Sequence, residues 1–450
     1  MRACQRVFAG WLVWLALAGV VYSASEAGAQ AQGGRPARGD SAAVARTDTT
    51  RAASDTSTWG ALERDGFLVA KTDRGTLYIS IYMLERYLNQ LPVDQSFVDH
   101  LGNLRQIETR NDIQLHRLQF WARGWFWVPK FRYEFQAWSV LSTTQVALVG
   151  YFAYLASKPL GLFAGISGIP GVMSLLNIAP YFLGTDRFLA DDYFRPGFTS
   201  GVWIQGEPAP GLNYKLMLGN SLNQLSITAV QLTRNLASGA SVWWMPTTHE
   251  FGPRGAGGSG DYEHHDTLAT RIGTAYARSR ENRFNNVPES SPDNTVIRLS
   301  DSLIPFAQGA LAPGVTVSNL NYQLASGSLG FKYRGAFLQG DYYQRWLTHF
   351  DADGPVPENH IVDKGYQLQA SYMAIPKRVE PFVETSQISG AFNYASDVGL
   401  GVNYYPGTGR YPKVNAMCLF VRHSPVSSTF GYYVGGQKGA TLALSVDMIF

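Results

Sequence analysis

The sequence has few cysteines and few charged residues for its length. It holds two cysteines in 450 residues, and Asp, Glu, Lys and Arg together make up 16% of the chain. Cys4 lies in a segment that we expect to be removed on export, so disulfides are not expected to hold the mature chain together. A chain of this size then needs a large core, several domains or a closed barrel.

An excess of charge of one sign is also missing. The formal net charge is only +3 at pH 7, which gives no support to nucleic-acid binding. The sequence contains no G-x-S-x-G, HExxH or Walker A motif and no cysteine pair for a metal. We therefore expect no enzyme activity, no catalytic residues, no cofactor and no metal site.

The strongest metal candidate is residues 261–266 (DYEHHD), where His264 and His265 are adjacent. Neighbouring residues on a strand point to opposite faces, so both cannot easily bind one ion. We interpret this segment as a solvated polar turn.

The N-terminus has the layout of a secretory signal. Arg2 and Arg6 precede an apolar run at residues 7–21, and small residues follow at 27–29. The run is shorter than the roughly 20 residues of a membrane-spanning helix. We predict a signal peptide at residues 1–29, a disordered periplasmic linker at 30–64 and a barrel domain at 65–450.

Glycine and aromatic residues are abundant, with 46 Gly, 24 Tyr, 24 Phe and 11 Trp. From Gly75 onward, apolar and polar side chains alternate in many short segments, the last of which ends on Phe450. Such a pattern is typical of a transmembrane antiparallel β-barrel with aromatic girdles. We predict sixteen strands, at residues 75–84, 113–124, 130–140, 143–156, 160–168, 198–206, 211–219, 238–246, 267–279, 315–333, 335–347, 365–374, 377–388, 395–405, 411–422 and 441–450.

The connections between these segments alternate between short and long, as expected for periplasmic turns and extracellular loops. Residues 247–266 fit this rhythm badly, because they would form a long periplasmic turn. Residues 159–185 carry no charge, but their many Gly and Pro residues exclude a membrane helix. We expect a strand that runs into an inward-folded loop.

Side chains that alternate with the lipid-facing ones point into the lumen. The charged residues that we expect to line the pore are Arg117, Arg123, Arg132, Glu134, Lys215 and Arg345. Rings of basic residues select anions. The alternative is a balanced network of ion pairs, because acids such as Asp341, Glu380 and Glu384 are also predicted inside.

A constriction loop is predicted at about residues 170–196. It is rich in aromatic residues, which should not stand freely in water, and inward folding would bury them and narrow the channel. The alternative is packing on the outer rim or against a neighbouring subunit. Its charged residues are Asp186, Arg187, Asp191, Asp192 and Arg195.

Several segments together show a known family pattern. Residues 115–140 (LHRLQFWARGWFWVPKFRYEFQAWSV) contain an Arg-rich strand, a short turn and a strand of the form F-R-Y-x-F. The further segments are residues 161–168, 186–187, 198–205, 366–383 and 398–405. In this order they resemble the phosphate-selective porins of the O and P type.

The resemblance implies a 16-stranded homotrimer that passes small anions, with basic residues along the pore. Carried over by position, these residues are Arg117, Arg123, Arg132 and Arg187. The low net charge and the acids of the loop depart from the family, which leaves phosphate selectivity open.

We therefore predict an outer-membrane porin of a Gram-negative-type bacterium, a passive channel for small hydrophilic solutes. Expected partners are membrane lipid, the solutes, identical subunits and the barrel-assembly machinery, which would read the C-terminal Phe450. The alternatives are a structural or adhesive barrel with partner-binding loops and an outer-membrane hydrolase. A hydrolase would need a histidine and a serine on one lipid-facing rim, and no spacing around His116, His349 or His360 supports one.

Overall fold

The computed structural model describes residues 66–140, 145–176, 180–223, 229–231, 233–252, 258–286, 295–428 and 431–450. The predicted signal peptide and the whole of the predicted linker lie outside these residues. Within the described part, sixteen strands, each antiparallel to its neighbours, form a closed barrel. The predicted fold class is confirmed.

All sixteen predicted strands are present, and half of them are longer than predicted. The wall strands are β2 (Gly75–Leu91), β5 (Asn111–Phe126), β6 (Val128–Val140), β7 (Gln145–Ser157), β8 (Leu160–Gly168), β9 (Phe198–Ala209), β10 (Leu212–Gly219), β11 (Ala237–Trp244), β12 (Ala269–Asn282), β13 (Val317–Tyr333), β14 (Ala336–Ala352), β15 (His360–Tyr372), β16 (Val379–Ser389), β17 (Tyr394–Tyr404), β18 (Lys413–Arg422) and β19 (Gly439–Ile449).

The barrel is polar inside and apolar outside. In β10, Asn213 and Lys215 are buried in the interior, whereas Leu216 and Leu218 are 43% and 51% exposed on the outer surface. The same alternation runs through β11 to β17. A soluble barrel would have the opposite polarity, and this arrangement suits a wall that faces lipid.

Aromatic side chains gather on the outer surface at one end of the barrel, which we call the turn end. Short turns join β5 to β6, β7 to β8, β9 to β10 and β13 to β14 there. Exposed aromatic residues near this end include Trp127, Tyr154, Trp244, Tyr333 and Tyr372. This ring has the composition of a girdle at a membrane interface.

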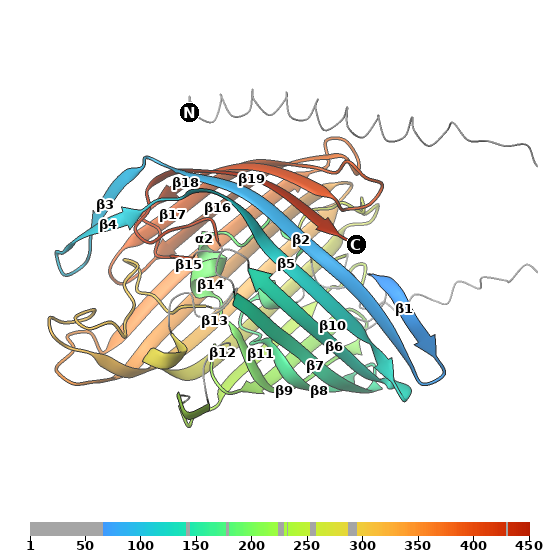
Figure 1. Ribbon diagram of the computed structural model, residues 1–450, viewed down its shortest axis with the longest axis horizontal. Coiled ribbons are helices and arrows are strands. Elements are labelled where there is room, and N and C mark those ends of the chain that lie inside the picture. The colour runs from blue at the N-terminus through green and yellow to red at the C-terminus, as the bar shows by residue number, and fades with distance from the viewer. Residues whose placement is uncertain are drawn as a thin grey trace, which may run out of the picture. The chain divides into compact units, whose positions relative to one another are not determined.

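The barrel closes between the last strand and the first wall strand, as the sequence pattern predicts. β19 pairs with β2 from Ala440–Leu91 to Ile449–Tyr82. The backbone N–H of Phe450 donates to the carbonyl of Ile81 at 3.1 Å, and the N–H of Ile81 donates back at 2.7 Å. Figure 1 shows the C-terminus at the turn end, beside β2.

Three short strands were not predicted. β1 (Phe67–Thr72) pairs with β2 next to the point where β19 ends, and it satisfies backbone groups of β2 that β19 does not reach. β3 (Asp94–Val98) and β4 (Leu104–Glu108) form a hairpin at the opposite, loop end of the barrel (Figure 1). The connection between the strands predicted at 75–84 and 113–124 therefore contains the end of β2 and this hairpin.

Among the described residues, no helix has the length and hydrophobicity needed to cross a membrane. The uncharged segment at residues 159–185 forms β8 and then leaves the wall, where a short 3-10 helix, η2 (Met173–Leu175), begins the path through the lumen.

Candidate pore and constriction loop

Between β8 and β9 the chain folds into the barrel instead of continuing outside it. A one-and-a-half-turn helix, α2 (Leu189–Phe194), lies in this loop and contacts β14, β15 and β16. Phe188, Leu189 and Phe194 are at most 1% exposed. Burial of these apolar side chains accounts for the inward folding, because each would cost about 1.5–3 kcal/mol in water. Figure 1 shows α2 within the ring of strands.

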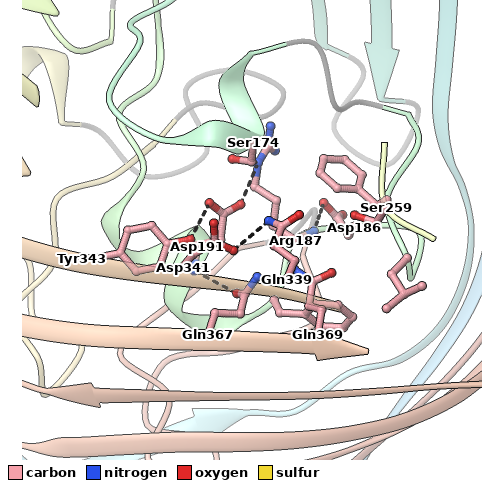
Figure 2. Close-up of a pocket in the computed structure, with 13 residues that line it drawn as sticks. Ser174, Asp186, Arg187, Asp191, Ser259, Gln339, Asp341, Tyr343, Gln367 and Gln369 are labelled. Carbon is pink, nitrogen blue, oxygen red and sulfur yellow. Dashed lines mark hydrogen bonds and ion pairs between the residues drawn. The ribbon is translucent and has the colours of Figure 1, made fainter. Parts of the chain in front are cut away.

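The β14–β16 side of the wall holds the loop through buried polar contacts. The guanidinium Nη2 of Arg345 lies 2.6 Å from the carboxylate Oδ2 of Asp363, and it also donates to the hydroxyl of Tyr193 at 2.5 Å. The Tyr343 hydroxyl donates to Asp191, and the Asp191 backbone N–H donates to Gln367, both at 3.3 Å. Figure 2 shows Tyr343 and Gln367 beside Asp191 of α2.

On the other side, the carboxylate of Asp186 ties the loop to β2 and β5. Its oxygens lie 2.9 Å from Arg117 Nη2, 3.4 Å from Arg86 Nη1 and 3.3 Å from His116 Nε2, and all four side chains are buried. Burial by itself would raise the pKa of Asp186, but Arg117 and its other basic neighbours hold the pKa well below its usual range. Asp186 is thus a charged clamp at physiological pH.

A bulge in β5 makes this clamp possible. Leu84 of β2 pairs with Arg117, but the next residue of β2 pairs with Leu115, so His116 is the extra residue. Strict alternation would place His116 and Arg117 on opposite faces, whereas a bulge lets both point inward. His116 is fully buried there, which removes it from the lipid-facing rim considered for a hydrolase.

Two further ion pairs lie within the loop itself. Arg187 Nε is 3.5 Å from Asp191 Oδ2, and Arg195 Nε is 3.1 Å from Asp192 Oδ1. Burial raises the pKa of Asp191 to about 6, against the opposing effect of Arg187. The loop therefore contains one acid that can change its charge near neutral pH.

The space that the loop leaves open lies along β5–β8. It is a cavity of about 160 Å³ between these strands and the loop, and Arg117, Glu134, Trp138, Tyr151 and Arg187 are among its lining residues. A smaller gap on the other side, between the loop and β14–β15, is lined by Ser174, Asp341 and Gln369 among others (Figure 2). The loop thus divides the lumen unequally.

The described residues of the connection between β11 and β12, 245–252 and 258–268, also fold inward, from the turn end. The predicted solvated polar turn at 261–266 is a wrong interpretation, because Asp261 is fully buried and accepts a hydrogen bond from the Gly335 backbone N–H at 2.7 Å. His265 lies between Asp261 and Glu250, 2.7 Å from the latter. The N–H of Ser259 donates to Tyr181 of the constriction loop at 2.8 Å, so the two inward segments meet.

The predicted pore residues all belong to inward positions of the wall, but most are paired. Arg117 and Arg345 bond to acids as described, and Lys215 donates to Ser167 Oγ at 2.7 Å and to the Gly168 carbonyl. Arg123 donates to Ser80 at 3.0 Å and lies opposite Glu134 across the β5–β6 pair. Arg132 and Glu134 are half-buried.

Sequence reasoning missed several residues of the site. Arg86, His116 and Asp363 hold the loop or its supporting strands, and Tyr432 and Tyr433 fold inward from the β18–β19 loop and are fully buried. The sequence does indicate that Arg86 faces the lumen, because Leu84, Arg86 and Leu88 continue the alternate positions of β2 whose side chains point inward. No signal in the sequence indicates the bulge at His116.

No family model and no curated protein matches this chain. Solved structures do match. Outer-membrane expressed OmpT of Vibrio cholerae is 12% identical, with 85% of this chain and 99% of that chain covered and a TM-score of 0.52. The trimer form of in-vitro folded OmpT from the same organism is 10% identical, covers 84% and 100%, and has a TM-score of 0.51. An anion-selective porin from Comamonas acidovorans is 12% identical, covers 84% and 100%, and has a TM-score of 0.48.

At these identities the likeness establishes the fold. The chain has the closed, sixteen-stranded antiparallel architecture of outer-membrane barrels.

Proposed function

We propose that this chain is an outer-membrane porin, a passive diffusion channel for small hydrophilic solutes. The observation that carries the proposal is the combination of an apolar outer wall, a polar lumen and a loop that narrows this lumen. No covalent step is needed for such a function, since a gradient drives diffusion and the lining selects by size and charge.

The proposal includes the location and the assembly. Residues 1–29 would direct export, residues 30–64 would stay in the periplasm, and Phe450 would be read by the assembly machinery. A homotrimer is proposed as well, and the trimer form among the similar structures supports it. Chemical cross-linking of the protein in native outer membranes would test it, with a band at three times the monomer mass expected and monomer alone contradicting it.

Ion selectivity is proposed to be weak. The basic residues first expected to attract anions lie beside carboxylates, as in the pairs Arg117–Asp186, Arg187–Asp191 and Arg345–Asp363. Opposite charges a few ångströms apart cancel most of the field that a basic ring would produce. These pairs therefore favour the balanced network over a phosphate-selective pore.

Planar-bilayer recording of the purified full-length mature protein tests the channel. Stepwise increases of current in KCl are expected, with a reversal potential near zero in a salt gradient. Absence of current from folded protein would overturn the proposal, and a strongly anionic reversal potential would overturn its selectivity.

A closed structural or adhesive barrel is the second candidate, and one observation favours it. The lumen receives the constriction loop, the described residues 245–252 and 258–268 from the turn end, and the buried Tyr432 and Tyr433 from the loop end. If these segments seal the pore, bilayers will show no current until they are loosened, for example by replacing Asp186.

A further inference from the structure

The cavity beside β5–β8 is unusual because it is lined by buried polar atoms without a hydrogen-bond partner among the described residues. Tyr82 Oη, Glu134 Oε2 and Trp138 Nε1 are buried, line this cavity and have no hydrogen-bond partner within the described part of the chain. Buried polar groups normally find partners, and each that does not costs about 1–3 kcal/mol. The cavity therefore presents a hydroxyl, a carboxylate oxygen that only accepts and an indole N–H that only donates. All three can form hydrogen bonds to a ligand or to water in the same space.

Aromatic side chains surround this cavity, but their faces are largely covered. Tyr82 and Trp121 stack on each other with ring centroids 6.3 Å apart and an interplanar angle of 20°, and both are at most 5% exposed. The Arg123 guanidinium lies 5.3 Å from the ring centroid of Trp121, and the Arg117 guanidinium lies 5.4 Å from that of Trp138 on β6. These rings therefore offer a ligand their polar edges more than their faces, which suits a small solute with many hydrogen-bonding groups.

The charge of the lining does not favour an anion. Arg117 and Arg187 are its two arginines, and each lies within 3.5 Å of a carboxylate of the loop, Asp186 and Asp191 respectively. Glu134 adds a third acid to the same surroundings. A bound anion would have to compete with carboxylates already in place, whereas neutral hydroxyl groups can both donate and accept without changing the charge balance.

We infer that this cavity is a binding subsite for a neutral polyhydroxylated solute of monosaccharide size. The hydroxyls of the sugar would donate to the Glu134 carboxylate and accept from the Trp138 N–H, the two unpartnered groups of opposite kind that line the cavity. The volume of about 160 Å³ fits one small solute or several water molecules and excludes a polymer coil. The inference rests on the proposed function, since it names the solute class of the same channel.

The test uses D-glucose as the probe and two independent readouts. Added glucose is expected to reduce the KCl current of single channels in a saturable manner. Saturation-transfer NMR of glucose with the detergent-solubilised protein is expected to give a signal even if the channel is closed. Trp138→Phe keeps the ring and removes the donor, and Glu134→Gln keeps the shape and removes the charge. Each should raise the half-saturating glucose concentration about tenfold, because Trp138→Phe removes one hydrogen bond and Glu134→Gln replaces a charged acceptor with a weaker neutral one.

Trp243→Phe is the matched control. Trp243 is also an inward, buried tryptophan whose Nε1 has no partner within the described residues, but it does not line the cavity. The Trp243→Phe variant should bind glucose as the unmodified protein does. Any effect of the viscosity of the glucose solution on the current should be the same in this variant.

The outcomes separate this inference from the proposed function. A channel that conducts KCl but gives neither saturable block nor an NMR signal with glucose overturns the inference and leaves the porin standing. Block by inorganic phosphate with glucose inert would also overturn it, in favour of an anion site. A saturable NMR signal that Trp138→Phe weakens, in a barrel without current, supports the subsite and overturns the channel.

Discussion

The two sides of the barrel wall treat the constriction loop differently. Along β14–β16, the inward side chains reach α2 directly, and Arg345, Tyr343 and Gln367 all bond to it or to its partners. Along β5–β8, the wall faces a cavity that the loop does not fill. One side thus supports the loop and the other leaves a cavity open, while the Asp186 clamp ties the loop to β2 and β5.

The described residues of the β11–β12 connection, 245–252 and 258–268, follow the same division. Asp261 accepts from Gly335 at the β13–β14 turn, and Arg410, ahead of β18, donates to the Ser259 carbonyl. The Arg334 N–H donates to the His265 carbonyl at 2.8 Å. Apart from the Asp186 clamp to β2 and β5, both inward segments therefore rest mainly on the part of the wall from β13 to β18. This arrangement explains how the lumen can be crowded and still leave a cavity elsewhere.

The largest effect is expected from breaking the clamp with Asp186→Asn. Arg86 and Arg117 would lose a buried counter-charge, a loss worth about 3–5 kcal/mol. The loop should loosen from β2 and β5, and the single-channel conductance in planar bilayers should rise, with a reversal potential shifted towards anions. Asp192→Asn is the control, because Asp192 pairs with Arg195 inside the loop. Unchanged conductance and selectivity in Asp186→Asn would show that the clamp does not set the opening.

The next effect concerns the supporting side. Arg345→Met leaves Asp363 buried without its 2.6 Å partner, at a cost of about 3–5 kcal/mol. The temperature at which the barrel unfolds in detergent, followed by its mobility on gels, should fall clearly. Arg280→Met is the control, since Arg280 pairs with a largely exposed Asp351 and such pairs contribute about 0–1 kcal/mol. Equal destabilisation by both variants would contradict the division of the wall.

Much of this wall could be predicted from the sequence, because the period-two pattern reports directly on which side of a strand each residue faces. The alternation through β10, with Lys215 inside and Leu216 outside, is a local property that needs no tertiary information. The same holds for the pairing of β19 with β2, which follows once the strands are counted.

The partners across the lumen could not be predicted in the same way. Arg345 was expected to face the lumen, but its pairing with Asp363 on β15 and Tyr193 on α2 was not predicted. Such contacts depend on how an irregular loop crosses the interior, and on a bulge at His116 that shifts the register by one residue. The inward course of the described residues 245–252 and 258–268 was missed because their polar sequence resembles a solvated turn, whereas their polar groups bond to one another.

A smaller effect should sharpen the contrast through pH. Burial raises the pKa of Asp191 to about 6. In the folded loop Asp191 is therefore a carboxylate above that pH, where burial makes its charge unfavourable, and it takes a proton below that pH. Its folded pKa lies above the unfolded value of about 3.9, so this group's destabilising contribution is relieved as the pH falls through about 6. Arg187, which also lines the cavity, then loses its counter-charge.

We expect the reversal potential in a KCl gradient to move towards anions between about pH 7 and about pH 5, with the loop still docked. Asp191→Asn should behave at both pH values as the unmodified channel does at the lower one. If the reversal potential of Asp191→Asn still shifts between the two pH values, another group titrates. Asp341 is the nearest alternative to test, because it faces the same gap (Figure 2).

The smallest effect is expected at the turn end, where His265 joins Asp261 and Glu250. Burial alone would lower the pKa of His265, but hydrogen bonds to Asp261 and Glu250 raise it to about 9, and the pKa values of both acids are lowered. A raised histidine pKa stabilises the turn fully below the unfolded value of about 6.5 and loses this contribution as the pH rises through about 9. The lowered pKa values of the acids add stability that is lost only in strong acid.

Residues 258–268 should therefore show slow hydrogen exchange at neutral pH, after correction for the intrinsic rate, and faster exchange above about pH 9. His265→Gln should remove this dependence, and His264→Gln, its neighbour outside the ion cluster, should retain it. If His265→Gln keeps the alkaline transition, the turn is held by its apolar contacts, such as Phe251 in the lumen, and the ion cluster does not fasten it to the supporting side.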